Sequence, residues 1–403
     1  MRWLVLSLFL FCSLRVEAGL ASSPSPGIAV AAAPTNTDFG IDLWPDTQNQ
    51  ANPGTIAGLD GVTPSETDCS TFYECTGDAC VHAPDCGTDW NSEGKKVLAA
   101  QLAVVTGQNA GERRRPALVL QLGDLADSYD MSNQKRRDDP CSSPTLNASQ
   151  LSEWTTIRDY ILTLMRSIGI PVGYVHGNHD ALGCYEQMIA AALSGMPYVH
   201  GSTVDAVNQD ASTIWAIKAP TRVGSLCAIT SGFDFYAETR DAALTLVGCG
   251  AALPTIIAHH AAINDSCDHT YFAVWNRLAA GDDLTDRADH PEIFALAAAH
   301  TTPESGFSCK TSYTGADSGQ TIFIMKQNWQ ELKHRNFGSG FGKGVTPANG
   351  GDGMLTRVLV SPSRKFLHSY DYNAVLDRKG GYGPVSATEL YASFDYCARF
   401  GGC

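Results

Sequence analysis

Short apolar runs that stop abruptly at a polar side chain recur along the chain. The run at 117–122, ALVLQL, is continuous rather than alternating, which is typical of a strand buried on both faces of a sheet. Further runs that predict strands are 38–44, 170–175, 254–258, 293–299, 321–327, 354–361 and 365–372.

Segments with helical spacing separate several of these runs. Residues 92–107 carry apolar side chains at helical intervals, and residues 151–169 carry a clear apolar stripe. The members of that stripe are Leu151, Trp154, Ile157, Ile161 and Leu164 or Met165. Strands that alternate with helices predict an α/β fold built on a mainly parallel sheet.

Five of the runs lead into side chains that bind metals or transfer protons. These side chains are Asp46, Asp124, Asn178 with His179, His259 and His300. The carboxyl ends of parallel strands meet at one edge of a sheet, where ligands bind, so we expect these groups to lie together. One Asp after a strand is an ordinary turn residue. Five endings of this kind predict a metal site.

Composition and charge narrow the function classes. A chain of 403 residues with 44% hydrophobic and 17% charged residues is typical of a globular protein with a sizeable core. Its net charge of −14 argues against a nucleic-acid surface. The glycine-rich segment 337–344 lacks the P-loop pattern, because Phe337 replaces a glycine and Gly344 replaces a serine or threonine. No Gly-x-Ser-x-Gly nucleophile motif of a serine hydrolase is present in the sequence.

The N-terminus indicates a secreted protein. Arg2, an apolar stretch and a small-residue site ending at Ala18 predict a signal peptide over 1–18. A Pro/Ala/Ser-rich linker follows over 19–37, and no later run is long enough to span a membrane. Two sequons, at Asn147 and Asn264, predict a glycoprotein.

Cysteine usage agrees with an extracellular location. Of thirteen cysteines, Cys12 leaves with the signal peptide, and we expect the remaining twelve to form disulfides. Four lie in an insertion at about 49–90 and lack the Cys-x-x-Cys pairs of a zinc site, which favours local bridges. They are Cys69, Cys75, Cys80 and Cys86.

The motifs WPDTQ, LGDLAD, GNHD, IIAHH and AAAHTT resemble those of the calcineurin-like metallophosphoesterase family. The most specific is GNHD at 177–180, and PDTQ points to a subgroup with Gln in place of a usual His. The resemblance implies an α/β fold of two packed mixed β-sheets flanked by helices, with the metal site at the carboxyl ends of the strands. It covers 38–375, with the Cys-rich insertion inside this domain, and leaves 376–403 as a C-terminal tail.

The resemblance also implies residue roles. Asp124 would bridge two metal ions. The remaining ligands would be Asn178, His259 and His300 at one ion, and Asp46 and Gln48 at the other. His179 would protonate the leaving oxygen, and Asp180 would orient it. Whether His259 or its neighbour His260 binds the metal stays open.

One motif departs from the family pattern, which usually ends its site with Gly-His-x-His. If His300 matches the first histidine, Thr302 replaces the second, and this loss falls on the ion that Gln48 serves. If His300 matches the second histidine, Ala298 replaces the first, and each of the two ion sites loses one ligand. We favour the first alignment because Ala299 then stands for the glycine. Fe, Zn or Mn is expected at the histidine-containing site, and Mn or Mg at the weaker one.

These observations favour a secreted, metal-dependent phosphoester hydrolase, a phosphatase or phosphodiesterase that uses a metal-activated water. A second hypothesis, which the AHTT departure motivates, is a catalytically silent secreted glycoprotein that keeps the fold for binding. The expected partner is a phosphoester substrate, with no nucleic acid and no membrane span. The sequence does not specify which phosphoester, or the oligomeric state.

Overall fold

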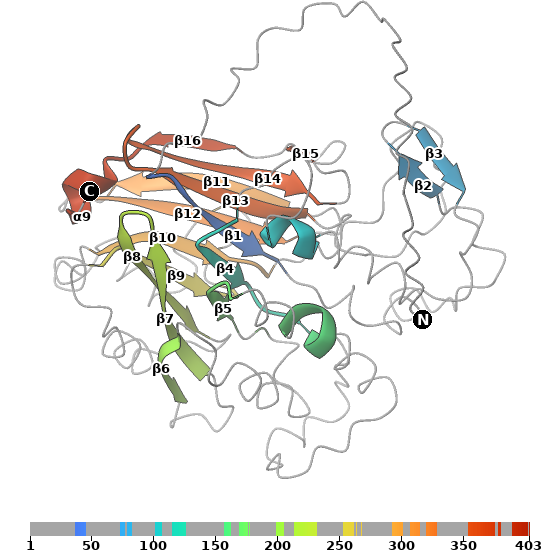
Figure 1. The fold of residues 1–403 in the computed structure, drawn as a ribbon, viewed down its shortest axis with the longest axis horizontal. Helices are drawn as coiled ribbons and strands as arrows, with labels where there is room; N and C mark the ends of the chain where they lie inside the picture. The colour runs from blue at the N-terminus through green and yellow to red at the C-terminus, as the bar shows by residue number, and fades with distance from the viewer. Residues whose placement is uncertain are drawn as a thin grey trace, which may run out of the picture. The chain divides into compact units, whose positions relative to one another are not determined.

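The chain divides into two compact units, Met1–Pro34 and Thr35–Cys403, and all of the description below concerns the second. The computed structural model describes residues 37–45, 73–76, 79–82, 101–106, 115–125, 157–162, 169–175, 177, 199–204, 213–231, 253–261, 263, 267, 292–300, 307–314, 320–328, 354–374, 378–379, 389–401 and 403. Within these ranges the fold is α/β, with two mixed β-sheets and few helices (Figure 1).

The first sheet holds seven of the described strands. Its order is β15-β14-β13-β1-β4-β5, and β16 also pairs with β14. β1, β4 and β5 are parallel, whereas the other neighbours are antiparallel. The strands are β1 (Phe39–Trp44), β4 (Leu118–Gln121), β5 (Val172–Tyr174), β13 (Met354–Ser361), β14 (Phe366–Asn373), β15 (Arg378–Lys379) and β16 (Leu390–Ser393).

The second sheet also holds seven described strands, in the order β11-β12-β10-β9-β8-β7-β6. Its centre, β8-β9-β10-β12, is parallel, and antiparallel pairs lie at both edges. The strands are β6 (Val199–Val204), β7 (Thr213–Thr221), β8 (Gly224–Ser231), β9 (Thr255–His259), β10 (Ile293–Ala298), β11 (Phe307–Thr314) and β12 (Thr321–Asn328).

The eight runs predicted as strands from the sequence are confirmed as β1, β4, β5, β9, β10, β12, β13 and β14. Continuous apolar runs form them because both faces of the strand are covered: every described residue of β4 and β10 is buried. The helical prediction is met in part. Residues 101–105 are helical, and Ile157–Leu162 form one π-helical turn, η4, with Ile157 buried.

One hydrophobic core includes side chains of both sheets. Ile41 and Leu120 of the first sheet belong to the same cluster as Ile256 and Phe323 of the second. Gly173 on β5 marks a close approach, because a Cβ there would lie 2.6 Å from Leu120 Cδ2 and 2.8 Å from Thr230 Cγ2 of β8. The two sheets therefore share an interior.

The segment separated as a tail in the sequence analysis, 376–403, contributes to this fold. β15 and β16 extend the first sheet, and α9 (Tyr396–Phe400) follows. Tyr396 is buried in the shared core, and the Arg399 guanidinium donates to the carbonyls of Thr321 and Ile293, where β12 and β10 begin. Burial of this aromatic ring and these hydrogen bonds attach the C-terminal segment to the two sheets.

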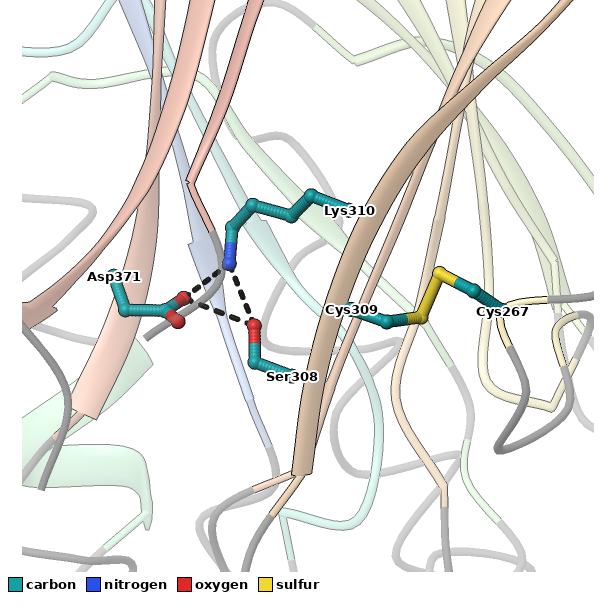
Figure 2. The surroundings of a disulfide bond; sticks show 5 residues. All are labelled: Cys267, Ser308, Cys309, Lys310 and Asp371. Atoms are coloured by element: carbon teal, nitrogen blue, oxygen red, sulfur yellow. Dashed lines mark hydrogen bonds and ion pairs between the residues drawn. A yellow bond between two sulfur atoms is a disulfide. The ribbon is translucent and has the colours of Figure 1, made fainter. Parts of the chain in front are cut away.

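Strand β11 is held on both of its faces (Figure 2). Ser308 and Lys310 point toward Asp371 of β14, and the Lys310 Nζ lies 2.5 Å from the Asp371 Oδ1. Cys309, between them, points the other way and forms a disulfide with Cys267. Burial lowers the pKa of the Lys310 ammonium, and the charge of Asp371 opposes that shift. The alternation of a strand explains why neighbouring residues bond in opposite directions.

Further cysteines are oxidised, as the sequence predicts. Cys397 and Cys403 form a second disulfide, and the buried Cys227 is also disulfide-bonded. In the insertion the backbone forms a two-stranded ribbon, β2 (Tyr73–Thr76) and β3 (Ala79–His82), whose register pairs Cys75 with Cys80. In the part of the chain that the structure describes, no helix is long and apolar enough to cross a membrane.

Candidate metal centre

Asp124, His260 and His300 converge just past the ends of three strands. Asp124 follows β4 of the first sheet, while His260 and His300 follow β9 and β10 of the second. One candidate ligand atom from each lies within 4.8 Å of the other two. Asp124 and His260 are buried, and His300 is half-buried. A carboxylate and two imidazoles in this arrangement could hold a divalent metal ion.

Strand register explains how distant segments meet here. In the first sheet Trp44 pairs with Gln121, and Gln121 pairs with Tyr174, so β1, β4 and β5 end at the same level. In the second sheet Ala258 pairs with Ala297 in parallel, so β9 and β10 also end together. The sequence predicts these groups at the carboxyl edge of one mainly parallel sheet. The structure corrects this: Asp124 follows a strand of the first sheet, whereas His260 and His300 follow strands of the second.

The turn that carries Asp124 has an unusual backbone. Gly123 has φ 103° and Asp124 has φ 51°, and the second value is rare for a residue with a side chain. Such a conformation costs about 1–3 kcal/mol and persists only where surrounding contacts hold it. The Gln121 side chain supplies such contacts: its Oε1 accepts from the Gly123 N–H at 2.9 Å, and its Nε2 donates to the Gly123 carbonyl at 2.8 Å. Strain held in this way is common at functional sites.

Two glycines let the backbone approach the ligands closely. A Cβ on Gly123 would lie 2.4 Å from Nδ1 of His260, and a Cβ on Gly177 would lie 2.1 Å from Oδ1 of Asp124. Gly177 opens the Gly-Asn-His-Asp motif. The motif therefore begins in direct contact with Asp124, since only hydrogen fits at that glycine.

The hydrogen bonds of His260 fix its tautomer. Its Nδ1 lies 2.7 Å from the Leu122 carbonyl, which can only accept, so Nδ1 carries the proton. Its Nε2 lies 3.1 Å from Oδ2 of Asp124. When the ring is neutral, Nε2 and Oδ2 are both acceptors, and a proton or a cation must lie between them to make the contact favourable. Both atoms could contact one cation at the usual distance of about 2.0–2.2 Å across this gap.

His259 has the opposite tautomer. Its Nδ1 accepts the Ala261 N–H at 3.1 Å, so the lone pair of the neutral ring is already used by the backbone. Burial, with the charges of His260 and His300, lowers the pKa of His259 to about 3. The side chain is therefore neutral near pH 7. Of the two adjacent histidines, His260 is the one whose Nε2 lies against Asp124.

His300 reaches the group through a backbone turn. Its φ is 47°, again in the left-handed region, and its ring centroid lies 4.9 Å from that of His260. The preceding Ala299 N–H donates to the His260 carbonyl at 3.0 Å, which ties the two histidine segments together. Both Asp124 and His300 thus depart from the extended backbone at the positions that bring them together.

Of the residues predicted from the sequence, Asp124 and His300 belong to this group, and His259 lies beside it. His260, which the sequence left as an alternative to His259, belongs to it as well. The remaining predicted residues, Asp46, Gln48, Asn178, His179, Asp180 and Thr302, lie outside the described residues. Sequence reasoning missed Gln121, because a glutamine at a strand end is an unremarkable residue.

Comparisons with known proteins do not assign a function to this chain. No family model matches the chain, and no curated protein matches it.

Proposed function

We propose that the chain is a metal-dependent phosphoester hydrolase whose ion is held by Asp124, His260 and His300. The convergence of the three side chains carries the proposal, because one candidate ligand atom of each lies within 4.8 Å of the other two. The choice of a phosphoester substrate comes from the Gly-Asn-His-Asp motif, whose first residue, Gly177, lies against Asp124. The resemblance to calcineurin-like metallophosphoesterases supports it.

A bound divalent cation supplies positive charge for the phosphate oxygens and lowers the pKa of a water molecule. The side chains and backbone of the protein position the metal ligands and supply the proton for the leaving group. The Leu122 carbonyl keeps the His260 proton on Nδ1, which leaves Nε2 as a ligand and follows the usual pattern of outer hydrogen bonds around metal sites. His179 would donate a proton from its imidazole to the leaving oxygen, while Asp180 would hold that ring.

A second, weaker ion site is part of the proposal. It involves Asp46, Gln48 and Thr302 together with the bridging Asp124. These side chains offer mainly oxygen atoms and only one or two charges, so Mn or Mg is the expected ion there. Asn178 would complete the histidine-containing site, where Fe, Zn or Mn is expected. We therefore infer one tightly held ion and one exchangeable ion.

We also infer that the protein acts outside the cytoplasm. The signal-like N-terminus predicts export, and the disulfides of Cys267 with Cys309 and Cys397 with Cys403 are the chemistry of an oxidising compartment. Intact-mass analysis of secreted protein, with and without thiol alkylation, tests this inference. Several alkylated thiols in native material would argue against it.

The direct test is hydrolysis by chelator-treated protein. We expect p-nitrophenyl phosphate or bis-p-nitrophenyl phosphate to be hydrolysed only after Mn²⁺, Zn²⁺, Mg²⁺ or Fe²⁺ is restored, with metal content followed by elemental analysis. The comparison of the monoester with the diester then assigns the substrate class. Protein that binds metal but hydrolyses neither ester would favour the silent glycoprotein, and protein that binds no metal would overturn the proposed centre.

Paired histidine variants test which of the adjacent histidines binds the ion. His260→Ala removes the Nε2 ligand, so we expect metal affinity to fall by roughly 10- to 100-fold or more. His259→Ala removes an accepted backbone hydrogen bond, so we expect a loss of stability of about 1–3 kcal/mol with the ion retained. Elemental analysis and urea unfolding of both variants separate these effects. The reverse outcome would make His259 the ligand.

A further inference from the structure

We propose that Gln121 is a positioning residue that holds both Asp124 and His260 in the geometry needed to bind the metal ion. The inference rests on the metal centre of the proposed function. Gln121 is the last residue of β4 and is almost fully buried. Its side chain does not belong to the group of candidate ligands, and its action is on the backbone that carries them.

The first step is the control of the peptide planes around Gly123. One amide side chain accepts from the Gly123 N–H and donates to the Gly123 carbonyl, at 2.9 Å and 2.8 Å. The Gly123 carbonyl belongs to the peptide unit that precedes Asp124. By fixing that plane, Gln121 sets the direction from which the Asp124 side chain leaves the turn.

The second step is the connection from this turn to His260. Leu122, between Gln121 and Gly123, accepts the Nδ1 proton of His260 through its carbonyl at 2.7 Å. The Leu122 N–H donates to the Trp44 carbonyl at 2.8 Å, and the Gln121 carbonyl accepts from the Val175 N–H at 2.9 Å. The turn is thus attached to β1, to the end of β5 and to the second sheet. A movement of this turn displaces both metal ligands.

The chemistry of the site requires glutamine in particular. Glutamate has the same shape but carries two acceptor oxygens, so one of them would face the Gly123 carbonyl without a proton to share. Asparagine is one methylene shorter and cannot reach both groups of Gly123 from the same Cα. Leucine keeps the apolar volume and loses both hydrogen bonds. Each substitution therefore perturbs the turn without removing a ligand.

The experiment measures Co²⁺ binding to folded Gln121→Glu and Gln121→Leu, with Gln101→Leu as the matched control. Gln101 is also buried, and its Nε2 donates to a backbone carbonyl, that of Met354 on β13. Co²⁺ affinity is determined by competition with a chelator, and the visible absorption spectrum of bound Co²⁺ reports the ligand geometry. The unfolding transition of each metal-free protein is recorded in urea.

We expect both Gln121 variants to bind Co²⁺ about 10- to 100-fold more weakly than the wild type, with an altered absorption spectrum. Gln101→Leu should shift the urea midpoint and leave the affinity and spectrum of the folded protein unchanged. If Gln121→Leu is not recovered folded, Gln121→Glu, which keeps the bond from the Gly123 N–H, decides the question.

The failures of the two proposals are distinguishable. Wild-type protein that binds no Co²⁺ overturns the proposed function and this inference together. Wild-type protein that binds Co²⁺ and hydrolyses phosphoesters, beside a Gln121→Glu variant with the same affinity and spectrum, overturns this inference alone. A Gln121 variant that loses stability, as Gln101→Leu does, but keeps the wild-type Co²⁺ affinity and absorption spectrum also overturns this inference alone.

Discussion

Asp124→Asn is expected to abolish metal binding at the candidate centre while the metal-free protein still folds. The new amide has the shape of the carboxylate but lacks its charge. Its N–H would donate to Nε2 of His260, which lies 3.1 Å from the Asp124 Oδ2 in the native chain. This neutral hydrogen bond replaces the proton- or cation-mediated contact of the native pair, so the fold does not need the ion. Loss of the cation removes several kcal/mol of transition-state stabilisation, so turnover should fall by about 10³-fold.

Two measurements check this result. Elemental analysis should find less ion in the variant, and thermal unfolding should show that added Mn²⁺ stabilises only the wild type. An ion present at 100 times its Kd stabilises a protein by about 2.7 kcal/mol, which is easily detected. An Asp124→Asn variant that keeps its metal would show that the carboxylate is not a ligand.

His179→Ala is expected to lower phosphoester hydrolysis by about 10²- to 10⁴-fold, which is the usual contribution of a positioned acid or base. The residue lies outside the described part of the chain, but Gly177, two residues earlier, lies against Asp124. The proposed role is proton donation to the leaving oxygen, so metal content should hardly change. The loss should also be smaller for esters with an acidic leaving group, which needs no proton.

The control is His368→Ala. His368 lies on β14, far along the chain from the candidate ligands, and its Nε2 bonds to Glu389. Its replacement should leave turnover near the wild-type value. If His179→Ala instead loses the metal ion while staying folded, the residue is a ligand and the assignment as an acid is wrong.

The central strands could be predicted from the sequence because burial on both faces leaves a strong pattern. β4 and β10 are buried throughout, and their apolar runs are correspondingly unbroken. The strand β7 has no unbroken apolar run and was not predicted. It contains the exposed Pro220, and proline within a run argues against a strand. In the described residues the register of β6 with β7 ends at Ile217, so Pro220 pairs with Ser225 of β8 and has no described strand partner on its other side.

The choice between His259 and His260 depends on which face of β9 meets the first sheet. Ile256 and Ala258 lie in the shared core, and His260 continues their face by the two-residue period of a strand. Both faces of β9 are apolar, so the pattern of residues does not mark the inner one. The role proposed for Gln121 was also beyond sequence reasoning, because it depends on backbone angles at Gly123 and Asp124.

The position of β1 in the first sheet has a consequence for how the protein is made. β1 lies between β4 and β13, and the register joins Phe39 to Val360 across most of the chain. Pairings between such distant segments slow folding, because closing the long intervening loop costs entropy before the contacts form. During synthesis β1 emerges before β4, and its other edge cannot be paired until β13 has emerged. An open apolar edge is a template for aggregation. Any truncation that removes β13 should therefore yield insoluble chains, however well the metal-binding segments are preserved.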